Sequence, residues 1–158
     1  MDTFTLVHVV LSLVGIGSGL VVLYGMLRGK RMDNGTALFL ATTVLTSVTG
    51  FFFPFHEVTP GIVVGIISIL LLGVAIVARY VRRLSGGWRS IYVITATIAL
   101  YLNGFVLVVQ LFEKVPELKA LAPTQKEPPF LVAQVLVMVI FVVLGILAVK
   151  GFKEQAMA

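Results

Sequence analysis

The chain consists of long apolar segments joined by short polar connections. Five segments predict membrane-spanning helices, because a helix that crosses the hydrocarbon core of a bilayer needs about 20 mostly apolar residues. They are Phe4–Leu27, Thr36–Phe55, Gly61–Tyr80, Ile91–Phe112 and Phe130–Val149. Arg79 is the only charged residue inside them. The pattern predicts an all-α membrane protein, a bundle of five transmembrane helices that forms a single integral membrane domain over residues 1–158.

Composition agrees with this prediction and excludes several classes of site. Hydrophobic residues make up 59% of the chain and charged residues 12%, about half the charged share of a typical soluble domain. The chain has no cysteine, which excludes disulfides, thiolate metal ligands and cysteine nucleophiles. The formal charge is +5, but the basic residues lie beside apolar segments, which favours a role in orientation over binding of nucleic acid.

The basic residues also predict the orientation of the chain. With five spans, nine of the 12 lysine and arginine residues fall on one side of the membrane: Arg28, Lys30, Arg31, Arg79, Arg82, Arg83, Arg89, Lys150 and Lys153. The positive-inside rule places that side in the cytoplasm. We therefore expect an outside N-terminus, a cytoplasmic C-terminus and a bacterial-type inner (plasma) membrane. The first segment begins Met-Asp-Thr without a basic region, so we expect a retained helix and not a signal peptide.

The outer connection, residues 113–129, is the longest one. Pro116–Leu121 could form one short interfacial helix, since proline is favoured in the first turn of a helix. The connection is interpreted as solvated, with a lid over a site as the alternative.

Small residues predict where the helices pack. Gly15 and Gly19 are spaced to lie on one face of the first span and allow close approach of another helix. In the second span Thr42, Thr46 and Thr49 lie on one face. Pro54 cannot donate to the carbonyl of Gly50, so a bend or opening is expected there.

Four polar side chains are predicted to lie at a similar depth near the outer face. Counted from the segment midpoints at about 1.5 Å per residue, His8, His56 and Gln110 lie at similar distances toward the outside, and Gln134 lies somewhat nearer the middle. His8 shares a face with Gly15 and Gly19, and His56 would end the threonine face of the second span. The four residues form the candidate cofactor-binding site.

Two chemistries suit these side chains. Imidazoles on neighbouring helices can ligate haem iron or another metal, so His8 and His56 are the candidate metal ligands, with haem b or a quinone as the leading cofactors. Gln110 and Gln134 could bond a quinone carbonyl or a ligating imidazole. The alternative is that both histidines are interfacial and only fix helix ends. A stable metal site normally has three or four ligands, and the sequence offers two.

Three functions remain open. The first is a non-enzymatic subunit or accessory protein of a membrane complex. The second is a redox membrane protein that holds haem or quinone between His8 and His56. The third is a small-solute transporter that acts as an oligomer. No metalloprotease, phosphate-loop or serine–histidine–acid motif is present, which argues against an enzyme. The expected partners are the lipid bilayer and either further copies of the chain or a larger membrane complex.

Overall fold

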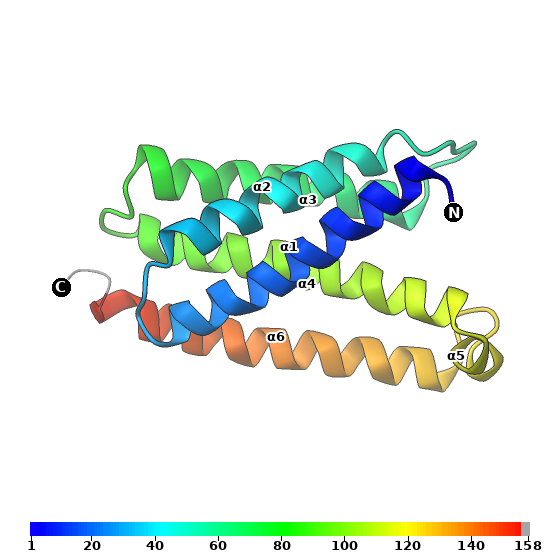
Figure 1. Cartoon of the computed structure of the whole chain (residues 1–158). Coiled ribbons are helices and arrows are strands. Elements are labelled where there is room, and N and C mark those ends of the chain that lie inside the picture. Colours follow the sequence, from blue (N-terminus) through cyan, green and yellow to red (C-terminus); the bar gives the residue numbers. More distant parts are fainter. Residues whose placement is uncertain (156–158) are drawn as a thin grey trace.

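The computed structural model describes residues 1–155, with side chains described as far as Phe152, as a bundle of long helices (Figure 1). Within this range all of the regular structure is helical. The elements are α1 (Thr3–Leu27), α2 (Asp33–Gly50), α3 (Pro60–Ile76), a π-helical turn η1 (Val77–Val81), α4 (Trp88–Lys114), α5 (Pro116–Leu121) and α6 (Pro128–Gln155). The five long helices run along a common direction, and successive long helices are antiparallel (Figure 1).

The end of α2 differs from the sequence prediction. The helix was expected to reach Phe55, and that boundary is wrong, because α2 ends at Gly50. Pro54 has no amide hydrogen for the Gly50 carbonyl, and it disfavours helical backbone at Phe53. The connection 51–59 therefore begins inside the predicted span. It ends at Thr59, whose hydroxyl accepts from the Ile62 amide and caps α3.

Four helices are long and apolar enough to cross a membrane: Thr3–Leu27, Pro60–Val81, Trp88–Lys114 and Pro128–Phe152. These results support a membrane protein. The helix α2 is not among the four, although it runs beside α1 and α3 (Figure 1). It has only 18 residues, of which six are threonine or serine, and this composition lowers its hydropathy.

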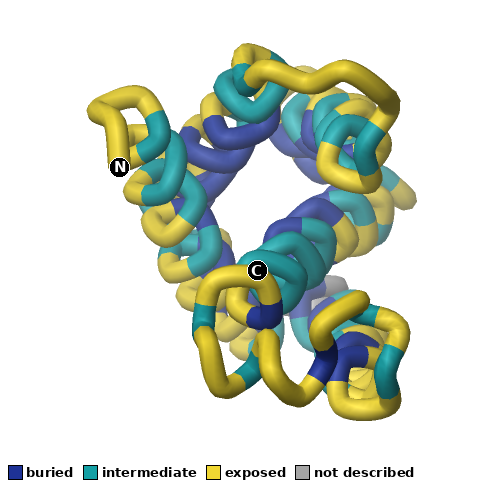
Figure 2. The backbone as a smooth tube through the Cα atoms, turned by 90° about the vertical axis from the view of Figure 1, so that its right-hand side faces the viewer, coloured by how far each residue is buried: buried dark blue, intermediate teal, exposed yellow. Residues whose placement is uncertain are grey.

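The polar side chains of α2 face the interior of the bundle. Its buried positions include Thr42, Thr43 and Thr46, while the exposed ones include Leu38 and Leu45. The Thr42 hydroxyl donates to the Leu38 carbonyl at 2.7 Å, and the Thr46 hydroxyl donates to the Thr42 carbonyl at 2.8 Å. In a soluble amphipathic helix the buried face is apolar, whereas in α2 the buried face combines these threonines with Phe39 and Leu40, and leucines lie on the exposed face. Figure 2 shows buried positions along the inner sides of the helices and exposed ones outside.

The predicted small-residue contact lies between α1 and α2. Gly15 and Gly19 are both buried. A Cβ atom at Gly15 would lie 3.2 Å from the Thr43 hydroxyl, and one at Gly19 would lie 2.8 Å from the Phe39 ring. Glycine at these positions is therefore what lets the two helices approach closely. This contact sets the register that brings the start of α1 and the end of α2 together.

Candidate functional site at His8

His8 joins the start of α1 to the end of α2. Its Nδ1 atom lies 2.8 Å from the hydroxyl oxygen of Thr49, the residue before α2 ends at Gly50. This is a hydrogen bond between two helices across 41 positions of sequence. The imidazole is half-buried. The sequence prediction that His8 faces another helix is thus confirmed by a named partner, Thr49, that was assigned only to the α2 face.

Two phenylalanine rings enclose one side of His8. The His8 and Phe53 rings meet edge to face with centroids 5.0 Å apart, and the Phe53 and Phe4 rings are also 5.0 Å apart. Gly50 also lies beside the imidazole, since an added Cβ there would be 3.6 Å from His8 Cε1, an ordinary packing distance. Phe53 reaches this position because the chain leaves the helix after Gly50. The early end of α2 therefore builds the aromatic wall.

His56 has a different environment from His8. It lies in the connection 51–59, beyond the end of α2, and is exposed. The prediction that it ends the threonine face assumed a helix that continued through Pro54. Because the backbone is not helical there, the counting of residues that placed His56 on that face and at that depth does not apply. His8 and His56 thus form no helix-to-helix pair of equivalent positions.

The two glutamines lie on other helices. Gln134 on α6 is buried, and its Nε2 donates to the Phe105 carbonyl on α4 at 3.2 Å. Gln110 on α4 is half-buried. The helix α1 approaches α6 where Leu27 meets Gly151, and it runs away from α6 toward its own start (Figure 1). Gln134 therefore joins α6 to α4. This bond lies far along α6 from Gly151, where α6 contacts the end of α1.

The structure also places a buried arginine that the sequence analysis assigned only to orientation. Arg79 is 3% exposed and lies in the turn η1 at the end of α3. Its Nη2 donates to the Asp33 carboxylate at 2.6 Å and to the Arg31 carbonyl at 2.8 Å. Its guanidinium lies 5.1 Å from the centroid of the Tyr92 ring. The sequence does contain a signal of an unusual role, because Arg79 is the only charged residue within the apolar segments. Its partners, however, lie up to 48 positions away in the sequence.

Arg79 completes a network that connects three helices. The Tyr92 hydroxyl on α4 bonds the Thr36 hydroxyl on α2 at 3.4 Å, and Thr36 donates to the Arg31 carbonyl at 3.3 Å. Every bond of this network connects groups of the chain itself. We interpret it as an anchor that fixes α2, α3 and α4 together through Arg79 Nη2 and the Tyr92 ring, although Arg79 Nη1 is buried without a hydrogen-bond partner.

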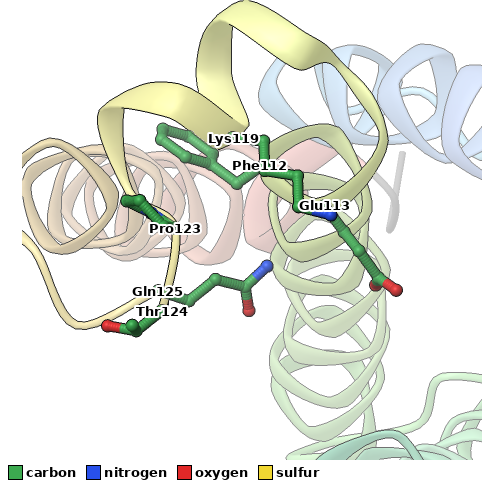
Figure 3. Close-up of a pocket in the computed structure, with 6 residues that line it drawn as sticks. All are labelled: Phe112, Glu113, Lys119, Pro123, Thr124 and Gln125. Carbon is green, nitrogen blue, oxygen red and sulfur yellow. The ribbon is translucent and has the colours of Figure 1, made fainter.

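A small cavity of about 250 Å³ lies at the end of the bundle opposite to the Arg79 network (Figure 3). It is formed where α4 meets α5 and the loop before α6, and its lining residues are Phe112, Glu113, Lys119, Pro123, Thr124 and Gln125. Gln125 Nε2 donates to the Val109 carbonyl at 3.0 Å, which fixes the loop on α4. The helix α5 occupies Pro116–Leu121, where the sequence suggested a short helix. Most of the lining side chains are exposed, so the cavity is an open depression.

Among the described residues, no group of three or more His, Cys, Asp or Glu side chains is arranged to hold a metal ion. The proposed ligands His8 and His56 would have to act without a third such residue. The site that the geometry does define is the smaller group of His8, Thr49 and Phe53.

Comparison with family models, curated proteins and solved structures gives no match. The function must therefore be argued from the geometry of the chain alone.

Proposed function

We propose that the chain is a small non-enzymatic integral membrane protein that acts as a subunit or accessory protein of a larger membrane complex. The observation that carries the proposal is the distribution of side chains on α2, with threonines inside the bundle and Leu38 and Leu45 outside. Such an arrangement is favourable in lipid, where the apolar surface faces hydrocarbon and polar groups are satisfied internally. In this proposal α2 is a fifth span, supported by the apolar helices on both of its sides.

The proposed orientation has the basic end in the cytoplasm of a bacterial-type cell and the N-terminus outside. The exposed Arg82 and Arg83 follow the buried Arg79 at the end of α3, and the exposed Lys30 and Arg31 connect α1 to α2. All four exposed residues lie in short connections close to the ends of the long helices, where basic residues determine topology. Aromatic rings accompany them, since Arg28 lies over Tyr24 and Arg82 over Trp88.

The packing of the interior favours an accessory role over transport. The void between α1, α2 and α4 is lined by Gly19, Phe39, Thr97 and Leu100, among others, and has no room for a water molecule. A solute path would need a wider, polar interior at this level. The interior hydroxyls of Thr42 and Thr46 donate to the backbone of their own helix, whereas those of Thr43 and Thr97 are buried without a partner.

The outer face of α6 supports association with a partner in the membrane. The long helix packs on α4 through few buried positions, among them Gln134 and Ala148. Its other sides are exposed and wholly apolar in the central part, for example at Val139 and Val143. In membranes such a face can contact either lipid or the helix of a partner, because both are equally apolar.

Site-directed cross-linking tests the proposal. Because the chain has no native cysteine, only the introduced cysteine of the chain can react. Single cysteines at Val139 on α6 and at Leu13 on α1, both exposed, are introduced into the chain at its natural expression level. We expect Val139→Cys to give a discrete cross-linked protein identified by mass spectrometry, and Leu13→Cys to be the matched control on another face. A native mass equal to one chain in its lipid belt, with no protein cross-linked at either position, would contradict the complex.

A further inference from the structure

The hydrogen bonds of Thr49 favour one tautomer of His8. The Thr49 hydroxyl has one proton, and it donates this proton to the Leu45 carbonyl at 2.7 Å, with a longer contact of 3.2 Å to the Thr46 carbonyl. The oxygen of Thr49 can then only accept from His8, whose Nδ1 lies 2.8 Å away. The neutral imidazole is therefore protonated on Nδ1, and Nε2 has a free lone pair.

This lone pair lies at a depth where water is scarce. His8 is seven residues from the middle of α1, which corresponds to about 10 Å, within the roughly 15 Å half-thickness of a hydrocarbon core. Among the described residues, Nε2 has no hydrogen-bond partner and is not one of the fully buried atoms without a partner. An acceptor without a donor in hydrocarbon is costly, so binding of a donor there is favourable.

The neighbours of His8 select the kind of donor. Phe53 meets the imidazole edge to face, Phe4 extends the wall, and Gly50 lies beside the imidazole without a side chain. A flat aromatic ring can pack against phenylalanine rings in offset or edge-to-face geometry. None of these neighbours carries a charge that would favour an ionic ligand.

We propose that His8 Nε2 accepts a hydrogen bond from an aromatic hydroxyl at outer-leaflet depth, and that the ligand class is the hydroquinone headgroup of a membrane quinol. Thr49 is the positioning residue, because its hydroxyl determines which nitrogen accepts. The site discriminates by redox state. A hydroquinone donates to Nε2 through a hydroxyl, whereas the oxidised quinone has only carbonyl oxygens, which cannot donate to the lone pair of Nε2. This inference concerns His8 alone, requires no contribution from His56, and does not depend on membership of a complex.

The first measurement is the tautomer itself. The protein is labelled with ¹⁵N-histidine, carries His56→Gln so that only His8 reports, and is placed in phosphatidylcholine nanodiscs near pH 8. We expect the proton on Nδ1 and an unprotonated Nε2 in the ¹⁵N spectrum. Thr49→Ser, which keeps the hydroxyl, should keep this pattern, and Thr49→Val should change it. A proton on Nε2 in the protein with intact Thr49 would overturn the proposal without any variant having to fold.

The second measurement uses duroquinol and duroquinone, whose methylated rings cannot react with lysine. Each is titrated under anaerobic conditions in the same nanodiscs while the His8 Nε2 signal is followed. We expect duroquinol to bind about five- to tenfold more tightly than duroquinone, the value of roughly one hydrogen bond. His8→Phe, which keeps a ring, and Thr49→Val should abolish this preference. Equal binding of the two forms, or an unchanged preference in both variants, would refute the assignment.

A third arm tests the other abundant donor in a membrane, the ammonium of phosphatidylethanolamine. Nanodiscs with and without this lipid are compared before any duroquinol is added. If the lipid alone shifts the Nε2 signal and excludes duroquinol, the donor is a lipid headgroup and the hydroquinone proposal fails. An unchanged Nε2 signal, followed by a normal response to duroquinol, supports the aromatic hydroxyl.

Discussion

Arg79 donates to the Asp33 carboxylate at 2.6 Å and so joins the end of α3 to the start of α2, although the two partners differ greatly in exposure. The Arg79 side chain is 1% exposed and the Asp33 side chain 70% exposed. The ion pair is therefore a buried cation that reaches a carboxylate in solvent. Its two ends should respond very differently to substitution.

Asp33→Asn should destabilise the protein by less than about 1 kcal/mol, because solvent screens the exposed carboxylate. Arg79→Met should cost about 3 kcal/mol, since it also removes the bond to the Arg31 carbonyl and the contact with Tyr92. Thermal unfolding of both variants in the same mild detergent measures the difference. Equal losses would mean that the ion pair alone, and not the network around it, stabilises this end of the bundle.

Gly19→Ala should destabilise the bundle by about 1–3 kcal/mol, because the added methyl group would lie 2.8 Å from the Phe39 ring and the helices would have to move apart. Gly17→Ala is the matched control, since nothing lies within 4 Å of its Cβ position. It should be neutral or stabilise by up to about 1 kcal/mol through helix propensity. Denaturant unfolding of the two variants, two residues apart on one helix, decides whether close packing or propensity dominates.

The orientation of the chain can be tested with single cysteines at two exposed positions outside the long helices. Lys126→Cys lies before α6, and Ser85→Cys lies between η1 and α4. A membrane-impermeant maleimide added to intact cells should label the first and leave the second unlabelled until the membrane is opened. The reverse pattern would place the basic end outside, and labelling of both in intact cells would exclude the proposed topology.

Glu127 connects pH to the order of the loop before α6. The Thr124 hydroxyl and amide donate to its carboxylate, and these bonds lower the pKa of Glu127 below its ordinary value of 4.5. A carboxylate with a lowered pKa contributes stability above its unfolded pKa, and this contribution is lost as pH falls through the folded value. We expect the Thr124 amide resonance to shift as the pH decreases below about 4.5. In Glu127→Gln the same resonance should not titrate there; a normal carboxyl pKa in the parent chain would contradict the bonds.

Local patterns predicted much of the fold. Apolar segments located the long helices, and the spacing of Gly15 and Gly19 identified the face that packs on α2. Such features depend on residues within a few turns of one another, which a sequence displays directly. Pro54 also indicated a change near Gly50, but from the sequence it predicted only a bend or an opening. In the structure the helix ends at Gly50.

The candidate site was predicted less well, because it depends on contacts between distant segments. Thr49 was recognised as part of a helix face, yet its bond to His8 joins positions 41 apart. His56 was given a depth by counting residues along a helix that does not reach it. Arg79 was assigned to orientation because its partners, Asp33 at the start of α2 and the Arg31 carbonyl just before it, are distant in sequence. No spacing rule connects such pairs before the packing is known.

The threonines of α2 have a consequence for how the chain enters a membrane. Thr42, Thr46 and Thr49 each donate to the carbonyl four residues earlier, so their hydroxyls are satisfied before any other helix is present. A hydropathy average counts these groups as if they needed water, and it therefore overstates the cost of transferring α2 from the insertion machinery to lipid. In the proposed five-span arrangement, α2 would enter together with α1 as a helical hairpin packed at Gly15 and Gly19, and a segment of modest hydropathy would insert because its neighbour enters with it.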